Sequence, residues 1–271
     1  MLADMHNHTN HSRDSECKLE DLYKAQIDKG THIFAVTDHF NNTELTPGND
    51  FDSIKESVEE VLAFRERCNG KHLILTGVEA GESIMDIDAH NKLISLADFD
   101  VVVGSIHKVS HKDFNRNFYI SIDFSKLSLV DISRFINSYF DDIIRMIEIA
   151  DFDILAHLTC PFRYIWCKHG ISICEEEYSE KIETILKMII KRRIALEVNT
   201  PYLERIGDFT PSKEILMKYR EFGGKLITLG SDSHTPNTAS AFFPQAVKLL
   251  KDTGFDNIYY YQNRKPHSLE L

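Results

Sequence analysis

The chain has 271 residues, of which 42% are hydrophobic, 27% are charged and 12 are glycine. This composition is typical of a globular protein with a substantial core, and it excludes the collagen-like, disulfide-scaffold and disordered classes. The 31 Lys and Arg residues against 42 Asp and Glu residues give a formal net charge of −11. Because such a chain repels phosphate backbones and anionic membranes, we expect neither a nucleic acid nor a membrane partner.

The five cysteines are odd in number and form no C-x-x-C pair, which is typical of free thiols in a reducing compartment. The first ten residues, MLADMHNHTN, have neither the basic region nor the apolar stretch of a signal peptide. Apolar runs such as residues 33–36 are far shorter than the roughly 20 residues needed to cross a bilayer. We therefore expect a cytoplasmic protein without a membrane-spanning segment.

Short apolar runs alternate with longer segments of helical spacing, and no linker or repeat separates them. The short runs predict seven buried strands, at residues 2–5, 33–37, 73–78, 101–106, 154–156, 194–198 and 226–229. The longer segments predict six helices, at residues 19–29, 52–68, 129–150, 174–192, 211–222 and 239–253. Repeated βα units imply parallel strands, hence a doubly wound sheet or a closed barrel, in a single domain spanning residues 1–271.

Polar residues indicate where two of these helices begin. Asp52 or Ser53 is the predicted cap of the second helix, and Thr210 followed by Pro211 is the predicted start of the fifth. Residues 108–125 match no regular period and predict a long loop of functional character.

Six of the seven predicted strands end in His, Asp or Glu. In chain order, the strand-end segments are Asp4-Met5-His6-Asn7-His8, Thr37-Asp38-His39, Gly77-Val78-Glu79, Gly104-Ser105-Ile106-His107, Leu155-Ala156-His157 and Gly230-Ser231-Asp232-Ser233-His234. The carboxyl ends of parallel strands lie on one face of a sheet or barrel, so these side chains are expected to converge. The spacing of two within His6-x-His8 and Asp232-x-His234 places both members of each pair on one side of an extended segment.

Imidazole and carboxylate donors together suit Zn, Mn or Fe, and the absence of cysteine from the set disfavours a structural zinc site. A single histidine at a strand end is more often a solvated side chain than a ligand. Six coincident strand ends favour a metal site, because surface histidines have no reason to follow the strands. Other histidines lie in loops, before strands or near the carboxyl terminus and have no predicted role: His32, His72, His90, His111, His169 and His267.

The strand-end motifs resemble those of the PHP (polymerase and histidinol phosphatase) superfamily over nearly the whole chain. Further features resemble the stand-alone histidinol-phosphate phosphatases of that superfamily: Asp14, Gly104-Ser105-Ile106-His107, the segment from His157 to Arg163, Leu196-Glu197-Val198-Asn199-Thr200 and Asn263-Arg264-Lys265-Pro266. The resemblance implies a distorted (βα)7 barrel of the PHP type, with its metal site at the carboxyl ends of the strands. It also implies hydrolysis of L-histidinol phosphate to L-histidinol and phosphate in histidine biosynthesis.

The same resemblance implies a centre of three divalent metal ions. The first ion would take His6, His8, Glu79 and Asp232, the second would share Glu79 and take His107 and His157, and the third would take Asp14, His39 and His234. Clustered divalent ions lower the pKa of a bridging water toward ~7 and neutralise phosphoryl oxygens, so the expected nucleophile is a metal-bridging hydroxide. Glu79 and Asp232 are accordingly candidate catalytic residues.

Two arginines are candidates for binding the phosphate. Arg163 follows His157 by six residues, and its planar guanidinium fits two phosphoryl oxygens. The resemblance assigns it to the substrate phosphate and implies a second arginine shortly after Asn199, for which Arg205 is the candidate. The substrate of these phosphatases carries an imidazole and an ammonium group, so we expect acidic residues and loops to line its binding pocket. The candidates are Glu16, Glu44 and residues 114–118.

Two other functions are compatible with these motifs. A PHP hydrolase acting on nucleotides or on protein phosphotyrosine would carry the same metal ligands. A non-catalytic PHP module serving as a binding domain typically loses ligands, whereas all nine positions here hold competent donors. The complete set of donors favours an enzyme over a non-catalytic module.

Overall fold

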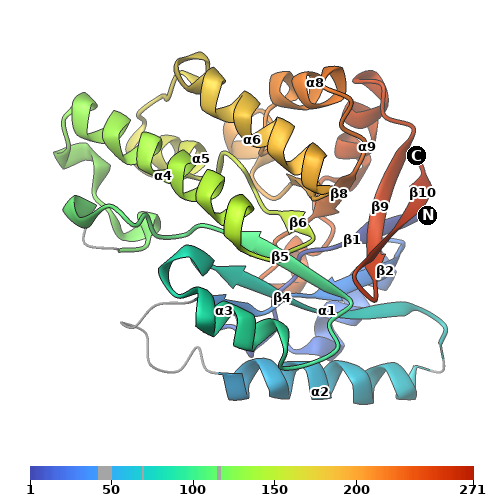
Figure 1. Cartoon of the computed structure of the whole chain (residues 1–271). Coiled ribbons are helices and arrows are strands. Elements are labelled where there is room, and N and C mark those ends of the chain that lie inside the picture. Colours follow the sequence, from blue (N-terminus) through green and yellow to red (C-terminus); the bar gives the residue numbers. More distant parts are fainter. Residues whose placement is uncertain (42–50, 69, 115–116) are drawn as a thin grey trace.

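The computed structural model describes residues 1–41, 51–68, 70–114 and 117–271 (Figure 1). Its main sheet contains all seven predicted strands, hydrogen-bonded in the order β1-β2-β4-β5-β6-β7-β8. These strands are β1 (Leu2–Asp4), β2 (Thr31–Val36), β4 (Leu73–Gly81), β5 (Val101–Ser105), β6 (Ile154–Leu155), β7 (Ala195–Asn199) and β8 (Ile227–Gly230). Each pairs with its neighbour in parallel, as repeated βα units require.

The first and last strands of this sheet meet and form a nearly closed barrel. The amide of Met5 donates a hydrogen bond to the carbonyl of Leu229 at 2.8 Å, and the amide of His8 donates to Ser233 at 2.8 Å. A short unpredicted strand, β3 (His39–Asn41), follows β2 and also pairs with β4. The predicted barrel is therefore confirmed, and the doubly wound sheet is excluded.

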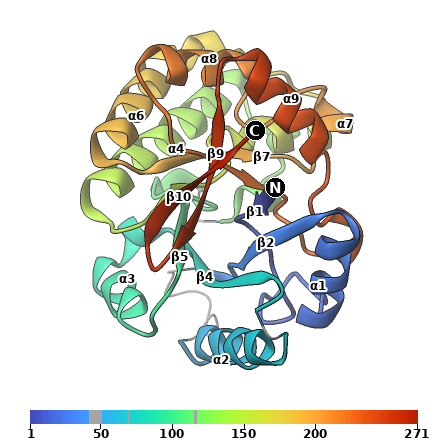
Figure 2. The same cartoon turned by 90° about the vertical axis from the view of Figure 1, so that its right-hand side faces the viewer.

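Helices surround the barrel (Figures 1 and 2). In the described part of the chain they are α1 (Leu19–Asp28), α2 (Phe51–Arg67), α3 (Ile87–Ile94), α4 (Leu129–Ile149), α5 (Cys160–His169), α6 (Ser179–Arg192), α7 (Leu203–Ile206), α8 (Lys213–Glu221) and α9 (Phe243–Asp252). The six predicted helices correspond to α1, α2, α4, α6, α8 and α9, whereas α3, α5 and α7 were not predicted. None of the described helices has both the length and the apolar character needed to cross a bilayer.

Two predicted helix starts were wrong. Helix α2 begins at Phe51, so Asp52 and Ser53 lie inside its first turn. Helix α8 begins two residues later than predicted, because the Ser212 hydroxyl accepts a hydrogen bond from the amide of Ile215 and caps it. The predicted loop at 108–125 is largely irregular in its described residues and contains short 3-10 turns at Lys112–Phe114, Tyr119–Ser121 and Phe124–Lys126.

Strand residues alternate between the barrel interior and the surrounding helices. In β5, for example, Val101 and Val103 join the interior cluster, whereas Val102 joins the core beneath the helices. The interior cluster consists of Ala3, Met5, Ile33, Ala35, Leu75, Val101, Val103, Ile154, Ala156, Ala195 and Tyr261. These apolar side chains fill the barrel below the carboxyl ends of its strands, so the polar residues at those ends lie above a packed base.

An unpredicted hairpin covers the amino end of the barrel. Its strands, β9 (Asn257–Gln262) and β10 (Lys265–Glu270), lie across the barrel near the amino terminus (Figure 2). The amide of Arg264 in its turn donates to the carbonyl of Asp100, directly before β5, and its guanidinium donates to Asp153, before β6. The hairpin thereby closes the end of the barrel opposite the strand-end histidines.

Candidate metal centre

Glu79, near the end of β4, lies at the centre of the predicted donors and is fully buried. Its Oε2 atom lies 3.3 Å from Nε2 of His6 and 3.6 Å from Nε2 of His8. Its Oε1 atom lies 3.2 Å from Nε2 of both His107 and His157. One carboxylate oxygen thus faces the ligands predicted for the first metal and the other faces those of the second, as in a bridging ligand.

Asp232 completes the first predicted set. Its Oδ1 atom lies 3.3 Å from Nε2 of His8 and 3.8 Å from Nε2 of His6. Asp232, two residues after the end of β8, has a φ of +47°, a left-handed conformation that is uncommon outside glycine. Donor atoms of His6, His8 and Asp232 lie within 4.8 Å of one another, close enough to share one ion.

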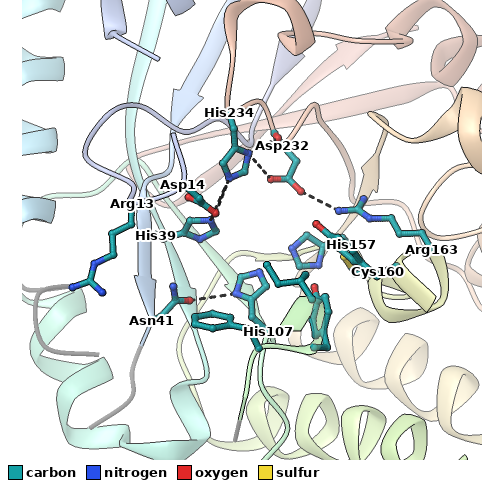
Figure 3. A pocket seen from close by; sticks show the side chains of 14 residues that line it. Arg13, Asp14, His39, Asn41, His107, His157, Cys160, Arg163, Asp232 and His234 are labelled. Carbon is teal, nitrogen blue, oxygen red and sulfur yellow. Dashed lines mark hydrogen bonds and ion pairs between the residues drawn. The ribbon is translucent and has the colours of Figure 1, made fainter. Parts of the chain in front are cut away.

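The third predicted set lies at the rim of the barrel (Figure 3). Oδ2 of Asp14 lies 3.5 Å from Nε2 of His39 and 3.4 Å from Nε2 of His234. The two imidazole nitrogens are themselves 3.4 Å apart. The Asp14 side chain is 58% exposed, so this set is the one most open to solvent. All nine predicted donors therefore converge, whereas the six histidines without a predicted role lie outside the donor clusters of the described residues.

The donor set fits divalent metal ions. Nε2 of His6 and Nε2 of His8 are buried and form no hydrogen bond within the described residues. Burial raises the pKa of Glu79, but His39, His107 and His6 outweigh this effect and hold the pKa well below 4.5. Burial together with His39 and His234 lowers the pKa of His8 to about 3. Glu79 is thus held ionised and His8 neutral, the forms in which these two residues bind metal.

Asp38, at the break between β2 and β3, organises the loop that carries Asp14. Its carboxylate accepts hydrogen bonds from the Thr9 amide and hydroxyl, both at 2.7 Å, and from the Ser12 hydroxyl at 2.6 Å. The Ser57 hydroxyl donates to the same carboxylate from α2 at 2.6 Å. No role was predicted for Asp38, although it directly precedes the predicted ligand His39.

His107 is oriented from two sides. Its amide and that of Lys108 donate to Oε1 of Glu82, at 2.5 and 3.1 Å. Its Nδ1 atom lies 3.3 Å from Oδ1 of Asn41, which leaves Nε2 directed toward the metal centre. Gly81 makes this contact possible, since a Cβ atom there would lie 2.6 Å from Oδ1 of Asn41.

Arg163 reaches the same centre from α5 and is only 3% exposed. Its Nη1 atom donates to Oδ1 of Asn199, and its Nη2 atom donates to Oδ2 of Asp232 at 3.3 Å. The guanidinium carbon lies 4.4 Å from the ring centroid of Tyr202 and 5.3 Å from that of Tyr164. The aromatic faces and the two acceptors hold the guanidinium beside a predicted metal ligand.

The PHP domain family matches residues 4–201, most of the chain. The chain belongs to this family. Among curated proteins, it is 28% identical to a probable histidinol-phosphatase of Clostridium acetobutylicum, with 96% of this chain and 97% of the relative aligned. It is 26% identical to a probable histidinol-phosphatase of Thermotoga maritima, covering 94% of each chain. It is 25% identical to the histidinol-phosphatase of Lactococcus lactis, covering 97% and 95%.

The chain also resembles a solved structure over nearly its whole length. That structure is the histidinol phosphate phosphatase of Lactococcus lactis complexed with zinc, L-histidinol and phosphate, at a TM-score of 0.80 and 22% identity. The similarity covers 98% of both chains. The two proteins therefore share the barrel fold.

Two adjoining cavities open onto the donor cluster. The first has a volume of about 250 Å³ and is also lined by Arg13, Asn41, Phe118, Tyr119, Ile120 and Cys160. The second has a volume of about 360 Å³ and is also lined by Pro201, Tyr202, Arg205, Thr235 and Thr238. Both cavities are bordered by Asp14, Arg163, Tyr164, Asp232 and His234. Arg205, an exposed residue of α7, therefore lies beside the centre rather than within it.

The walls of the first cavity differ from those predicted. Glu16 is exposed and does not line this cavity, and Glu44 lies outside the described residues. Phe118 lines it, whereas Phe114 packs into the hydrophobic core, and residues 115–116 lie outside the described residues. Among the described lining residues, the carboxylates are Asp14 and Asp232, both predicted ligands. Sequence reasoning missed Tyr119 and Tyr164, because aromatic residues in a loop and beside Arg163 gave no periodic signal.

Proposed function

We propose that this PHP domain is a metal-dependent phosphomonoesterase that hydrolyses L-histidinol phosphate to L-histidinol and phosphate, as a step of histidine biosynthesis. The observation that carries the proposal is Arg163, a buried cation with its guanidinium 3.3 Å from Asp232 at the edge of the nine-donor cluster. Relatives named histidinol-phosphatase, aligned over nearly the whole chain, support the choice of substrate.

We propose that the cluster holds three divalent ions, drawn from Zn, Mn and Fe, in the sets given by the sequence. The first set is His6, His8, Glu79 and Asp232, the second is Glu79, His107 and His157, and the third is Asp14, His39 and His234. The position of Glu79 between the first two sets and the mixed nitrogen and oxygen donors support this assignment. The zinc bound to the Lactococcus lactis structure agrees with it.

Divalent ions held by these residues would activate water for attack and would neutralise the charge on the phosphoryl group. Arg163 would bind two phosphoryl oxygens through its planar fork, with Tyr164 and Tyr202 holding the guanidinium in place. Arg205 is the proposed second phosphate-binding residue, acting from the adjoining cavity. The organic part of the substrate would lie against the aromatic wall formed by Phe118 and neighbouring residues.

We also propose that the protein is a single-domain cytoplasmic enzyme whose partner is a small molecule. The free state of all five cysteines supports a reducing compartment. The net charge of −11 argues against nucleic acid and anionic membranes as partners.

The proposal is tested by metal content per chain together with phosphate release from L-histidinol phosphate. AMP, a nucleoside 3′,5′-bisphosphate and a phosphotyrosine peptide serve as competing substrates. We expect L-histidinol phosphate to have the highest kcat/KM, and a tenfold preference for a competitor would overturn the substrate assignment. Chelation should abolish turnover and added Mn or Zn should restore it, whereas activity that persists without metal contradicts the mechanism.

A further inference from the structure

Strand β7 supplies none of the nine predicted metal ligands, yet two of its polar side chains lie among them. Ala195 belongs to the interior cluster, and the alternation of a strand directs Glu197 and Asn199 to the same side. Leu196 and Val198 pack outward against the helices. Glu197 and Asn199 are each 1% exposed, so both place polar groups at the boundary between the barrel core and the donor cluster.

Glu197 contacts two proposed ligands with its two oxygens. Oε1 lies 2.6 Å from Nδ1 of His6, and Oε2 accepts a hydrogen bond from the amide of His157 at 2.7 Å. When Nδ1 of His6 donates to this carboxylate, the lone pair of Nε2 is left for a metal. His157 has a φ of +26°, a strained conformation that the hydrogen bond to Glu197 stabilises. Gly230 leaves room for this arrangement, since a Cβ atom there would lie 2.0 Å from Oε1 of Glu197.

Asn199 connects Glu197 with the proposed phosphate-binding arginine. Its Oδ1 atom accepts a hydrogen bond from Nη1 of Arg163. Its Nδ2 atom donates to Oε2 of Glu197 at 3.2 Å and to Oδ2 of Asp232 at 3.4 Å. An amide suits this position, because it accepts from the cation on one side and donates to the carboxylates on the other.

We propose that Glu197 and Asn199 form a positioning pair that ties the metal cluster to the phosphate-binding arginine. Glu197 sets the tautomer of His6 and the backbone of His157, and Asn199 sets the direction of Arg163. The hydrogen bond between them makes the two halves of the site one structural unit. The inference rests on the proposed function for the roles of His6 and Arg163.

The contacts of the pair distinguish it from ordinary core packing. Among the described residues, each side-chain hydrogen bond of Glu197 or Asn199 ends on a proposed site residue or on the other member of the pair. Burying a carboxylate is unfavourable unless its partners compensate, and apolar residues would fill the barrel at a lower desolvation cost. The polar pair is therefore explained by the residues that it orients.

The first test is a double-mutant cycle on inorganic phosphate binding to the metal-loaded protein. Asn199→Leu should raise the phosphate Kd about tenfold when it is compared with the wild type at equal metal content, the loss of roughly one hydrogen bond to a charged group. In an Arg163→Met background, the same Asn199→Leu substitution should change the Kd less than about twofold, because its effect passes through Arg163. An unchanged Kd in the single variant, or full additivity in the double variant, overturns the role of Asn199.

The second test is metal retention after dialysis against a metal buffer. Glu197→Gln should retain less metal than the wild type, because one amide cannot accept hydrogen bonds at both of the positions that the carboxylate serves. Thr228→Val is the matched control, since Thr228 is the fully buried cross-strand partner of Glu197 and its hydroxyl forms no hydrogen bond in the described structure. Wild-type metal retention in Glu197→Gln, or an equal loss in Thr228→Val, overturns the role of Glu197.

Neither test depends on the identity of the substrate. A wild-type protein that binds metal and inorganic phosphate but leaves L-histidinol phosphate intact contradicts the proposed function and leaves the positioning pair in place. A protein that hydrolyses L-histidinol phosphate but shows no effect of Asn199→Leu contradicts the pair alone. If Glu197→Gln does not fold, as judged by circular dichroism, the Asn199 and Arg163 cycle still decides whether the pair acts on the arginine.

Discussion

Nδ1 of His39 lies 2.6 Å from Oε2 of Glu79, at the carboxyl end of the barrel. The contact exists because β3 pairs in parallel with β4, which sets His39 directly beside Glu79 in the register. His39 also reaches Asp14 with its other nitrogen, so it connects the rim of the cluster with its centre.

The central position of Glu79 makes its substitution the most damaging one in the cluster. Glu79→Gln removes the negative charge that faces His6, His8, His39, His107 and His157. We expect the bound metal to fall and turnover of L-histidinol phosphate to drop by about 100-fold or more, since outer-shell changes alone cost up to that amount. Metal analysis and phosphate release on the same preparation measure both effects.

His169→Asn is the control for this experiment. His169 lies in the last turn of α5, where its Nδ1 atom is 3.7 Å from Asp123 and its ring packs against Phe124. Its substitution should leave metal content and turnover within about twofold of the wild type, as expected of a residue away from the site. Equal losses in the two variants would mean that Glu79 acts through general stability.

The phosphate-binding role of Arg163 depends on the shape of the guanidinium as well as on its charge. Arg163→Lys keeps the charge but loses the planar fork and the stacking on Tyr202. We expect KM for L-histidinol phosphate and the inhibition constant of inorganic phosphate to rise about tenfold or more, with metal content preserved. Steady-state kinetics with phosphate as a competitive inhibitor provides the measurement. If phosphate inhibits this variant as strongly as it inhibits the wild type, Arg163 does not bind the phosphate.

Tyr202 should act through its ring rather than its hydroxyl. The guanidinium carbons of Arg163 and Arg205 lie 4.4 and 5.7 Å from the centroid of this ring. Tyr202→Phe keeps the ring and should preserve KM, whereas Tyr202→Leu should raise KM roughly threefold to tenfold, the range expected of lost cation–π contacts. If the two variants have the same KM, the ring does not hold the arginines.

The strand-end donors were predictable because a parallel barrel leaves little freedom in where its strands finish. Each of the six motifs follows an apolar run, and every run became a strand of the same sheet. Glu197 gave no such signal because it lies inside the predicted run at 194–198, and Asn199 gave none because it is an amide rather than a His, Asp or Glu. Their role depends on which side of β7 faces the barrel, and that side becomes evident only when Ala195 is seen in the interior cluster.

Two of the missed elements, α5 and β9, have irregular buried faces. Helix α5 buries Cys160, Pro161, Arg163 and Ile165, so a charged residue and a proline occupy the side where an amphipathic pattern would be sought. In β9, the most buried positions are Ile258 and Tyr261, three residues apart rather than two. Neither segment therefore shows the apolar period of its own secondary structure.

The amino end of the barrel carries a histidine pair that should make stability sensitive to acid. Nδ1 of His32 lies 3.1 Å from Nδ1 of His72, and their rings stack with centroids 4.9 Å apart. Burial, followed by the charges of His32 and Lys71, lowers the pKa of His72 below 6.5. The unfolded chain therefore binds this proton at a higher pH than the folded protein. The stability that neutral His72 provides is present above pH 6.5 and is lost as the pH falls below that value.

We expect His72→Gln to reduce the decrease in melting temperature between pH 7.5 and pH 5.5. Metal-free protein should be used throughout, so that acid-induced loss of metal does not contribute to the comparison. His267→Gln is the control, because His267 is exposed on β10, stacks on Tyr260, and should leave the pH dependence of the wild type unchanged. An equal decrease in melting temperature between pH 7.5 and pH 5.5 in the wild type and in His72→Gln would contradict the prediction, since the remaining titrating groups are common to both proteins.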